Sequence, residues 1–281
     1  MHRDAPGRGG QRGDAVVACA VLALLIACQP AADEVVEPPC GGDQDCSTEL
    51  GAFQVWAPEG WTGEPLDVLV YFHGYDGEPA QYSGSESRME DFSDAGVLLV
   101  LPYGEGGSWN PWGTEGFGGQ RRDDLAFYAQ LVDFVDTWWP TERHWVSGFS
   151  LGASMAYQVA CEDEVDAAVG TSGGFWEPLP ATCPASSVPF RHEHGTADGT
   201  WPLEGRTFSG GAKQGAAEDM VAFWREHNGC SATGTAYDDD PLSCTRWTCA
   251  DETVVDYCLH DEGHKRPSGW IGRLTTWLAS R

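Results

Sequence analysis

The chain contains 281 residues, and 41% of them are hydrophobic, which is enough apolar material for one sizeable core and little more. Its 43 acidic residues far outnumber its 16 lysines and arginines, and the formal net charge of −27 disfavours nucleic acids and anionic membrane surfaces as partners. We therefore expect a single folded domain and no nucleic-acid-binding function.

The first 27 residues have the pattern of an export signal. Three arginines precede an uncharged run over residues 15–27, which is too short and too close to the N-terminus for a convincing membrane span. The run ends in Leu-Ile-Ala-Cys and resembles the lipobox at which bacterial lipoproteins are cut and lipidated on the cysteine, here Cys28. We expect residues 1–27 to be removed and the protein to be secreted. If Cys28 is lipidated, we expect a lipoprotein that contacts the membrane only through this lipid anchor. If Cys28 matches the lipobox only by chance, we expect a free extracellular protein.

A tether is expected between this signal and the folded domain. Residues 28–48 are rich in proline and acidic side chains and lack apolar periodicity, which is typical of an extended linker. Within the tether, Cys40 and Cys46 are close enough in sequence to close a small disulfide loop. The catalytic domain is expected to occupy residues 49–281.

Cysteine usage supports export independently of the signal. Setting aside Cys19 and Cys28 leaves eight cysteines, an even number that indicates disulfides formed in an oxidising compartment. Sequence alone leaves their connectivity open. The pairs that we expect are Cys40 with Cys46, Cys161 with Cys183, Cys230 with Cys258, and Cys244 with Cys249.

Two patterns that suit a metal are weak here. None of the eight cysteines shows the C-x-x-C spacing of common structural zinc sites. His192 and His194 lie two apart on an expected strand, but no third ligand is apparent nearby. We therefore expect no metal, and the absence of a glycine-rich phosphate loop gives no reason to expect a nucleotide or other cofactor.

Strands alternate with helices along the rest of the chain. Residues 66–72 and 97–101 are nearly continuous apolar runs that end at His-Gly and at a proline, as buried parallel strands do. From Asp123 apolar side chains recur at helical spacing as far as Pro140, with two aspartates in the first turn, where the helix dipole favours anions. A short strand is expected at residues 145–147.

The same alternation continues to the C-terminus. Helices are expected over residues 151–160 and 216–227, and strands over 188–192 and 254–259. A closing amphipathic helix carries on one face Trp270, Ile271, Leu274, Trp277 and Leu278. This order predicts the α/β class, with a mostly parallel central sheet, helices on both of its faces, and a single domain.

One motif combines the right spacing with the right place in this order. Residues 148–152 read Gly-Phe-Ser-Leu-Gly, the G-x-S-x-G pattern, where an expected strand passes into an expected helix. A nucleophile there sits on a tight, strained turn, and side chains two residues before or after it would collide with the neighbouring strand and helix. Chance matches occur in glycine-rich chains, but this context favours Ser150 as a nucleophile and predicts the α/β-hydrolase fold.

A serine nucleophile requires a histidine base and a carboxylate that orients it. In this fold they follow the serine in the order acid, then histidine. Asp198 follows the strand at 188–192 and is the expected acid, and His264 follows the last strand and is the expected base. The rivals by residue type are His260, at the very end of that strand, and three aspartates on or beside helices, Asp163, Asp166 and Asp219.

The oxyanion that forms during nucleophilic attack needs two fixed N–H donors. We expect one from Leu151, at the start of the helix after the nucleophile, and the other from Tyr75, in the loop after the first strand. His73 in the same loop is a further catalytic candidate. A histidine just before an oxyanion glycine more often braces the loop by hydrogen bonds.

Taken together, these blocks resemble the polyhydroxybutyrate depolymerase and feruloyl esterase family. The resemblance runs from about Leu66 to Leu278 and rests on Phe72-His73-Gly74, Asp123-Asp124, the serine motif followed by Cys161, His194-Gly195-Thr196-Ala197-Asp198, Trp224 with Asn228-Gly229-Cys230, and Gly263-His264. It implies an α/β-hydrolase fold, extracellular ester hydrolysis without a cofactor, and a triad of Ser150, Asp198 and His264. The chain departs from the family pattern at two places. The family often has a cysteine where this chain has Tyr75, and often has Trp-Pro-Gly where this chain has Lys-Arg-Pro at residues 265–267. These departures concern the substrate more than the mechanism.

Loops on the expected catalytic side of the sheet are rich in tryptophan. Trp109 and Trp112 precede the helix that begins near residue 123, and Trp201 follows the candidate acid. With Phe149 they are candidate substrate-binding residues of an aromatic cleft for a bulky acyl group or a polymer chain. Alternatively the tryptophans cap the core from above, since buried tryptophan is common.

The sequence therefore predicts a secreted serine carboxylic-ester hydrolase. Short-chain, aromatic or polymer-linked esters are favoured over long-chain triglycerides, because a short polar stretch joins the helix after Ser150 to the strand at 188–192 and leaves no room for a lipase cap. A serine peptidase uses the same triad and stays open as an alternative. A binding protein that has lost catalysis is disfavoured because all three triad positions are filled, and the sequence does not indicate an oligomeric state.

Overall fold

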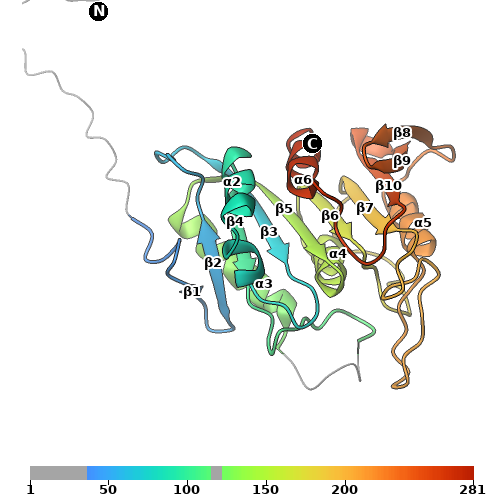
Figure 1. Ribbon diagram of the computed structural model, residues 1–281, viewed down its shortest axis with the longest axis horizontal. Helices are drawn as coiled ribbons and strands as arrows, with labels where there is room; N and C mark the ends of the chain where they lie inside the picture. Colours follow the sequence, from blue (N-terminus) through green and yellow to red (C-terminus); the bar gives the residue numbers. More distant parts are fainter. Residues whose placement is uncertain (1–36, 115–121) are drawn as a thin grey trace, which may run out of the picture. The chain divides into compact units, whose positions relative to one another are not determined.

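A sheet runs through the described part of the chain, with parallel strands in its middle and antiparallel strands at both edges (Figure 1). The computed structural model describes residues 37–114 and 122–281. Within these residues the strand order is β1-β2-β4-β3-β5-β6-β7-β10-β9-β8, and the strands from β4 to β10 in this order are parallel. The strands are β1 Cys46–Ser47, β2 Ala52–Trp56, β3 Leu66–Phe72, β4 Leu98–Pro102, β5 Thr141–Phe149, β6 Ala167–Thr171, β7 Phe190–Gly195, β8 Thr235–Asp239, β9 Leu242–Thr248 and β10 Val254–His260.

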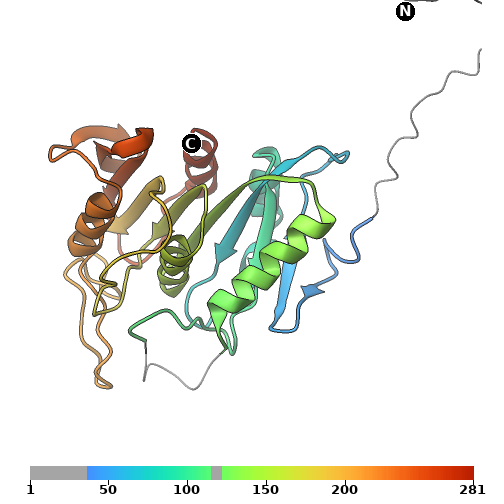
Figure 2. The same cartoon turned by 180° about the vertical axis from the view of Figure 1, so that it is seen from behind.

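Helices cover both faces of this sheet, as the sequence predicts. In Figure 1 α2 and α6 lie on the face toward the viewer, and Figure 2 shows α3 and α4 on the other face. Buried side chains of α5 share the core under α3 and α4, whereas Tyr82 of α1 packs with α2 and α6. The helices are α1 Ala80–Ser83, α2 Glu86–Asp94, α3 Asp124–Trp138, α4 Leu151–Glu162, α5 Ala217–His227 and α6 Trp270–Ala279, with one 3-10 turn, Ala250–Glu252.

The central strand β3 shows why the sheet is buried on both faces. Successive side chains of a strand point to opposite faces, so Val68, Val70 and Phe72 enter the core under α3 and α4, and Leu69 and Tyr71 enter the core under α2 and α6. All five are at most 2% exposed. The continuous apolar run in the sequence is therefore a parallel strand covered on both sides.

Several elements were missed by the sequence prediction, and their residues explain why. β6 consists of small residues, and a Cβ at its Gly170 would lie 2.4 Å from the Tyr157 hydroxyl, so α4 packs too closely for a typical bulky strand residue. β8 is mostly exposed and polar and carries no alternating apolar pattern. The short helices α1 and α2 are equally poor in apolar periodicity.

The disulfide pairing is partly as expected and partly different. In the described residues the bonds are Cys40–Cys46, Cys161–Cys183, Cys230–Cys249 and Cys244–Cys258. The expected pairs Cys230 with Cys258 and Cys244 with Cys249 are wrong. Antiparallel pairing of β9 with β10 sets Cys244 directly opposite Cys258, and the chain after α5 runs beside the end of β9, which brings Cys230 to Cys249. This register is a tertiary feature that cysteine spacing does not reveal.

The folded domain begins earlier than expected. β1 pairs with β2, and Cys46 is 1% exposed within the core, so part of the segment assigned to a tether at 28–48 belongs to the sheet. The expected signal at 1–27 and the lipidation candidate Cys28 lie outside the described residues. No helix in the ranges 37–114 and 122–281 is long and apolar enough to cross a bilayer.

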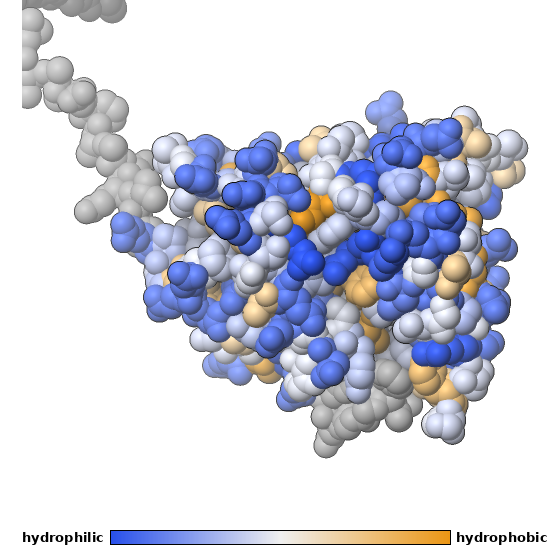
Figure 3. Space-filling view, viewed as in Figure 1, coloured by the Kyte–Doolittle hydropathy of each residue, from blue (hydrophilic) through white to orange (hydrophobic). Residues whose placement is uncertain are grey.

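The face of the molecule in Figure 3 is mainly hydrophilic. The face in Figure 3 shows apolar side chains only in small, separated patches. Among the described residues, Tyr75 is the large hydrophobic side chain that is exposed, at 58%. It lies in the loop that follows β3.

Candidate active site

Ser150 occupies the sharp turn between β5 and α4. Its backbone angles, φ 57° and ψ −123°, are rare for a residue with a side chain and mark a strained turn. A Cβ at Gly148 would lie 2.3 Å from the oxygen of Gly152, and a Cβ at Gly152 would lie 2.1 Å from the oxygen of Phe72. Neither position accepts a larger residue, so the two glycines let α4 approach the strands while the turn presents the serine at their carboxyl ends.

His264 and Asp198 reach Ser150 from two other strand ends. His264 Nε2 lies 3.0 Å from Ser150 Oγ, and His264 Nδ1 lies 2.7 Å from Asp198 Oδ2. A carboxylate only accepts hydrogen bonds, so Nδ1 carries the proton and Nε2 is left to accept from the serine hydroxyl. This order of donors and acceptors is the one that a general base needs to take the serine proton.

Further donors surround the carboxylate of Asp198. Its Oδ1 accepts from the backbone N–H groups of Thr200 and Trp201, each at 2.8 Å, and His194 Nε2 lies 3.4 Å from Oδ2. Burial by itself favours the neutral acid, but hydrogen bonds from His194, His264 and Trp201 outweigh it and hold the pKa of Asp198 well below its usual value. Asp198 is therefore ionised at neutral pH and placed to stabilise a positive charge on His264.

The rival residues lie elsewhere. His260 ends β10, where it accepts a backbone N–H at 3.3 Å, and burial lowers its pKa. Asp163 follows the last turn of α4, Asp219 lies within α5, and Asp166 accepts a backbone N–H of β5 at 2.7 Å. In the described residues none of the four hydrogen-bonds to Ser150.

The loop after β3 lies against the nucleophile. A Cβ at Gly74 would be 3.5 Å from the Cβ of Ser150, so Gly74, which precedes Tyr75, packs against the serine. The amide of Leu151 belongs to the first turn of α4, where N–H groups have no partner inside the helix and the helix dipole is positive. The Leu151 amide directly follows the serine, and the role of the Leu151 and Tyr75 amides as oxyanion donors stays a prediction.

His73 braces this loop. Its Nε2 accepts the N–H of Gly104 at 3.0 Å, so Nδ1 carries the proton and donates to the oxygen of Gly74 at 2.7 Å. Trp109 Nε1 donates to the oxygen of His73 at 2.7 Å. Burial lowers the pKa of His73 and keeps it neutral. Both ring nitrogens are therefore occupied with holding the loop.

Two of the tryptophans expected to line a cleft are buried. Trp109 is 0% exposed and Trp201 is 1% exposed, with its Nε1 donating to a backbone oxygen at 3.2 Å. The cleft interpretation is wrong for these two, because their loops fold back onto the sheet and the indoles fill the core. Trp112 and Phe149 are half-buried, and the ring of Phe149 lies 4.9 Å from that of His264. Of these four, Phe149 is the one placed beside the candidate triad.

The two histidines considered for a metal serve a different purpose. His192 and His194 hydrogen-bond to each other at 2.9 Å, and Tyr157 bonds to His192 at 2.7 Å. No group of three or more His, Cys, Asp or Glu side chains able to hold a metal occurs in the described ranges. Sequence reasoning missed Tyr157 because it lies 35 residues from its partner.

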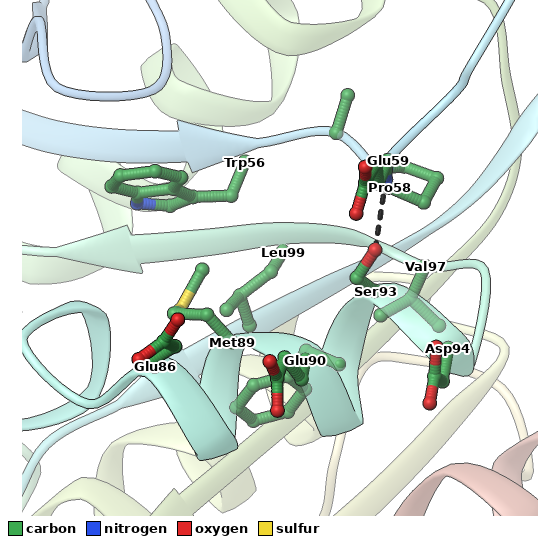
Figure 4. A pocket seen from close by; sticks show the side chains of 12 residues that line it. Trp56, Pro58, Glu59, Glu86, Met89, Glu90, Ser93, Asp94, Val97 and Leu99 are labelled. Atoms are coloured by element: carbon green, nitrogen blue, oxygen red, sulfur yellow. Dashed lines mark hydrogen bonds between the residues drawn. The ribbon is translucent and has the colours of Figure 1, made fainter.

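A separate pocket lies far from the serine, at the amino ends of the parallel strands (Figure 4). It has a volume of about 370 Å³ and sits between α2, the end of β2 and the start of β4. Its floor is apolar and its rim is acidic, formed by Trp56, Met89, Val97 and Leu99 and by Glu59, Glu86, Glu90 and Asp94. Acidic side chains are common over this whole chain, so they identify no ligand here.

Comparison with solved structures defines the fold. An acetyl xylan esterase from Aspergillus awamori matches with a TM-score of 0.59 and 14% identity over 85% of this chain and 99% of that one. A Bacillus cereus carboxylesterase matches with a TM-score of 0.52 and 15% identity over 81% of this chain and 94% of that one. A fluorophosphonate-binding serine hydrolase from Staphylococcus aureus matches with a TM-score of 0.52 and 11% identity over 84% and 95%.

These similarities show the fold alone, because all the identities are low. The chain has the α/β-hydrolase fold, with a mostly parallel sheet and helices on both faces, as the sequence predicts. No protein-family model and no curated protein matches its sequence.

Proposed function

We propose that this protein is a serine hydrolase that cleaves carboxylic esters. The observation that carries the proposal is the line of hydrogen bonds, 3.0 Å and then 2.7 Å, from Ser150 through His264 to the buried carboxylate of Asp198. The strained turn under the serine supports the same reading, because backbone strain of this kind persists mainly at functional sites. The similar solved structures, several of which are named as esterases or serine hydrolases, also support it.

The proposed reaction is acyl transfer in two steps. His264 Nε2 takes the proton of Ser150 while Oγ attacks the ester carbonyl carbon, and Asp198 stabilises the imidazolium that forms. The amides of Leu151 and Tyr75 donate to the tetrahedral oxyanion. His264 then protonates the leaving alcohol, and a water molecule activated by the same imidazole releases the acid.

The proposed substrates are short-chain, aromatic or polymer-linked esters. The resemblance to polyhydroxybutyrate depolymerases and feruloyl esterases supports this class, as does the likeness to an acetyl xylan esterase. The chain between α4 and β7 forms β6 and no helix, so no helical lipase cap is inserted there. Phe149 beside the base and the exposed ring of Tyr75 offer apolar contacts for an acyl group.

A substrate panel tests this proposal. We expect p-nitrophenyl butyrate and methyl ferulate to be hydrolysed, with triolein the poorest ester and a chromogenic peptide uncleaved. Hydrolysis of a hydroxybutyrate oligomer in the same panel indicates a polymeric substrate. Peptide cleavage without ester cleavage would identify a serine peptidase, turnover of neither would favour a binding protein, and triolein as the best substrate would contradict the proposed specificity.

Export and lipid anchoring belong to the same proposal. Four disulfides in the described residues support folding in an oxidising compartment. Mass spectrometry of the protein from the cells that make it is expected to find a chain that begins with a lipidated Cys28. A mature chain with an unmodified N-terminus would indicate free secretion, and retention of residues 1–27 would contradict export.

A further inference from the structure

A line of buried polar side chains runs behind the candidate acid. Tyr157 Oη lies 2.7 Å from His192 Nδ1, His192 Nε2 lies 2.9 Å from His194 Nδ1, and His194 Nε2 lies 2.7 Å from the oxygen of Trp201. Tyr157, His192 and His194 are each 0% exposed. The line connects α4, which begins next to Ser150, with β7, which leads to the acid.

One arrangement of protons satisfies every contact with neutral groups. The oxygen of Trp201 can only accept, so His194 carries its proton on Nε2. His194 Nδ1 then accepts from Nε2–H of His192, and His192 Nδ1 accepts from the hydroxyl of Tyr157. Burial, followed by the neighbouring His194, lowers the pKa of His192, and burial raises the pKa of Tyr157. His192 and Tyr157 are therefore neutral, and in this arrangement every hydrogen bond in the line is donated in the direction of Asp198.

The end of this line meets the acid at two points. His194 Nε2 faces both the oxygen of Trp201, at 2.7 Å, and Oδ2 of Asp198, at 3.4 Å. The backbone N–H of Trp201 donates to Oδ1 of the same carboxylate at 2.8 Å. His194, Trp201 and Asp198 thus form a closed ring of contacts. Because Oδ2 also receives the 2.7 Å bond from His264, a shift of this oxygen would misplace the base.

We infer that His194 is a positioning residue for ester hydrolysis, whose Nε2 donor holds Asp198 and the Trp201 backbone in register with His264. The inference rests on the proposed function of the triad. His192 and Tyr157 hold the ring of His194 in place, because His192 Nε2 bonds to His194 Nδ1 at 2.9 Å and Tyr157 Oη bonds to His192 Nδ1 at 2.7 Å. Other titratable groups near this line are Tyr257, which stacks on His192 at 5.9 Å, and His260.

Matched substitutions at His194 separate positioning from packing. His194→Met keeps bulk but removes the donor, and we expect kcat to fall by about 10- to 100-fold with KM changed by less than about twofold. His194→Gln places an amide N–H near the position of Nε2, and we expect it to restore kcat to within about fivefold of the parent. The control is His144→Gln, because His144 lies at the far end of β5 and bonds to Asp136 at 2.8 Å. It should leave both constants unaltered.

A double-mutant cycle with Asp198→Ala gives the decisive result. A residue that acts through Asp198 has nothing left to position in that background, so adding His194→Met should lower kcat by less than about twofold more. Losses that multiply would overturn the inference, as would a parent-like kcat in His194→Met. Thermal unfolding of each variant monitors folding. If His194→Met does not fold, His194→Asn replaces it, because its shorter amide does not reach the carboxylate.

Failure of the proposed function gives a different pattern. The triad assignment itself is wrong if the parent protein hydrolyses no ester. It is also wrong if the Ser150→Ala variant hydrolyses an ester as fast as the parent protein does. If the parent depends on Ser150 but not on His194, only the positioning role is wrong.

Discussion

Two regions of the same sheet are held together by different forces. At the carboxyl ends of β5, β7 and β10, a strained serine and a set of buried polar side chains are held by hydrogen bonds and ring contacts. The antiparallel strands β8 and β9 carry few buried apolar residues and are instead fastened by Cys244–Cys258, Cys230–Cys249 and the pairing of Arg246 with Asp256 at 2.7 Å. Changes at the catalytic edge should therefore alter chemistry with little effect on folding, and changes in the antiparallel region should do the reverse.

The largest effect is expected from Ser150→Ala. Removing the nucleophile should lower kcat for p-nitrophenyl butyrate by about 10⁴-fold or more, while the free energy of unfolding changes little because the hydroxyl contributes one part-buried hydrogen bond. Steady-state kinetics and urea unfolding measure the two quantities. The control is Ser268→Ala, an exposed serine outside the site, which should alter neither. Retention of a tenth of the activity would rule out Ser150 as the nucleophile.

The opposite pattern is expected when Cys244 and Cys258 are both replaced by alanine. The bond closes a loop between paired strands, and its loss should lower the free energy of unfolding by about 2–4 kcal/mol. Below the unfolding transition, kcat should stay within about twofold of the parent, because no catalytic group lies on β9. A large loss of kcat in a folded variant would show that the two regions are coupled.

Acid should weaken the antiparallel region through Asp256. Burial favours its neutral form, but hydrogen bonds from Arg246, Trp277 and Tyr237 outweigh this and lower its pKa in the folded chain. The carboxylate therefore stabilises the fold above about pH 4, and this contribution is lost as the pH falls through the folded-state pKa.

Asp256→Asn should consequently cost about 1–3 kcal/mol near pH 7 and progressively less below about pH 4. Chemical denaturation at several pH values measures the difference from the parent. Asp238→Asn, on the exposed side of β8, is the matched control. If the loss of stability in Asp256→Asn does not depend on pH, the substitution acts through side-chain packing and not through the charge of the carboxylate.

The smallest effect concerns Tyr75. Its backbone amide is the expected oxyanion donor, and its ring, which is 58% exposed in the loop after β3, is proposed to contact the acyl group. Tyr75→Ala keeps the amide and should raise KM for an aromatic ester by about 3- to 10-fold, with kcat nearly unchanged. Tyr75→Phe keeps the ring and should behave as the parent. Equal KM values in the parent, Tyr75→Ala and Tyr75→Phe would show that the Tyr75 ring does not contribute to substrate binding.

The candidate site at the carboxyl ends of the strands was more predictable from the sequence than the rest of the molecule. Ser150 belongs to a local motif whose glycines have a steric cause, and the order of acid and base along the chain follows from the fold. The long apolar strand β3 and the amphipathic helix α6 are equally local signals. β3 has the predicted ends, and α6 contains all the apolar residues expected on its face. Each of these features can be recognised from residues that are neighbours in the sequence.

What the sequence did not reveal depends on contacts between distant segments. The register of β9 against β10 decides the pairing of Cys244, and only the folded loops show that Trp109 and Trp201 are buried. The line from Tyr157 to His194 joins a helix to a strand across the core, and no local pattern marks it. Polar β8 carries no apolar period for a prediction to detect.

The most direct test of the central claim is titration of the parent protein with a fluorophosphonate, which reacts with an activated serine. We expect one equivalent to abolish ester hydrolysis completely, and peptide mapping to place the label on Ser150. Labelling should be lost in Ser150→Ala and strongly slowed in a variant whose His264 is replaced by alanine. Full ester hydrolysis after complete labelling, or a label on any other residue that accounts for the lost activity, would contradict the account.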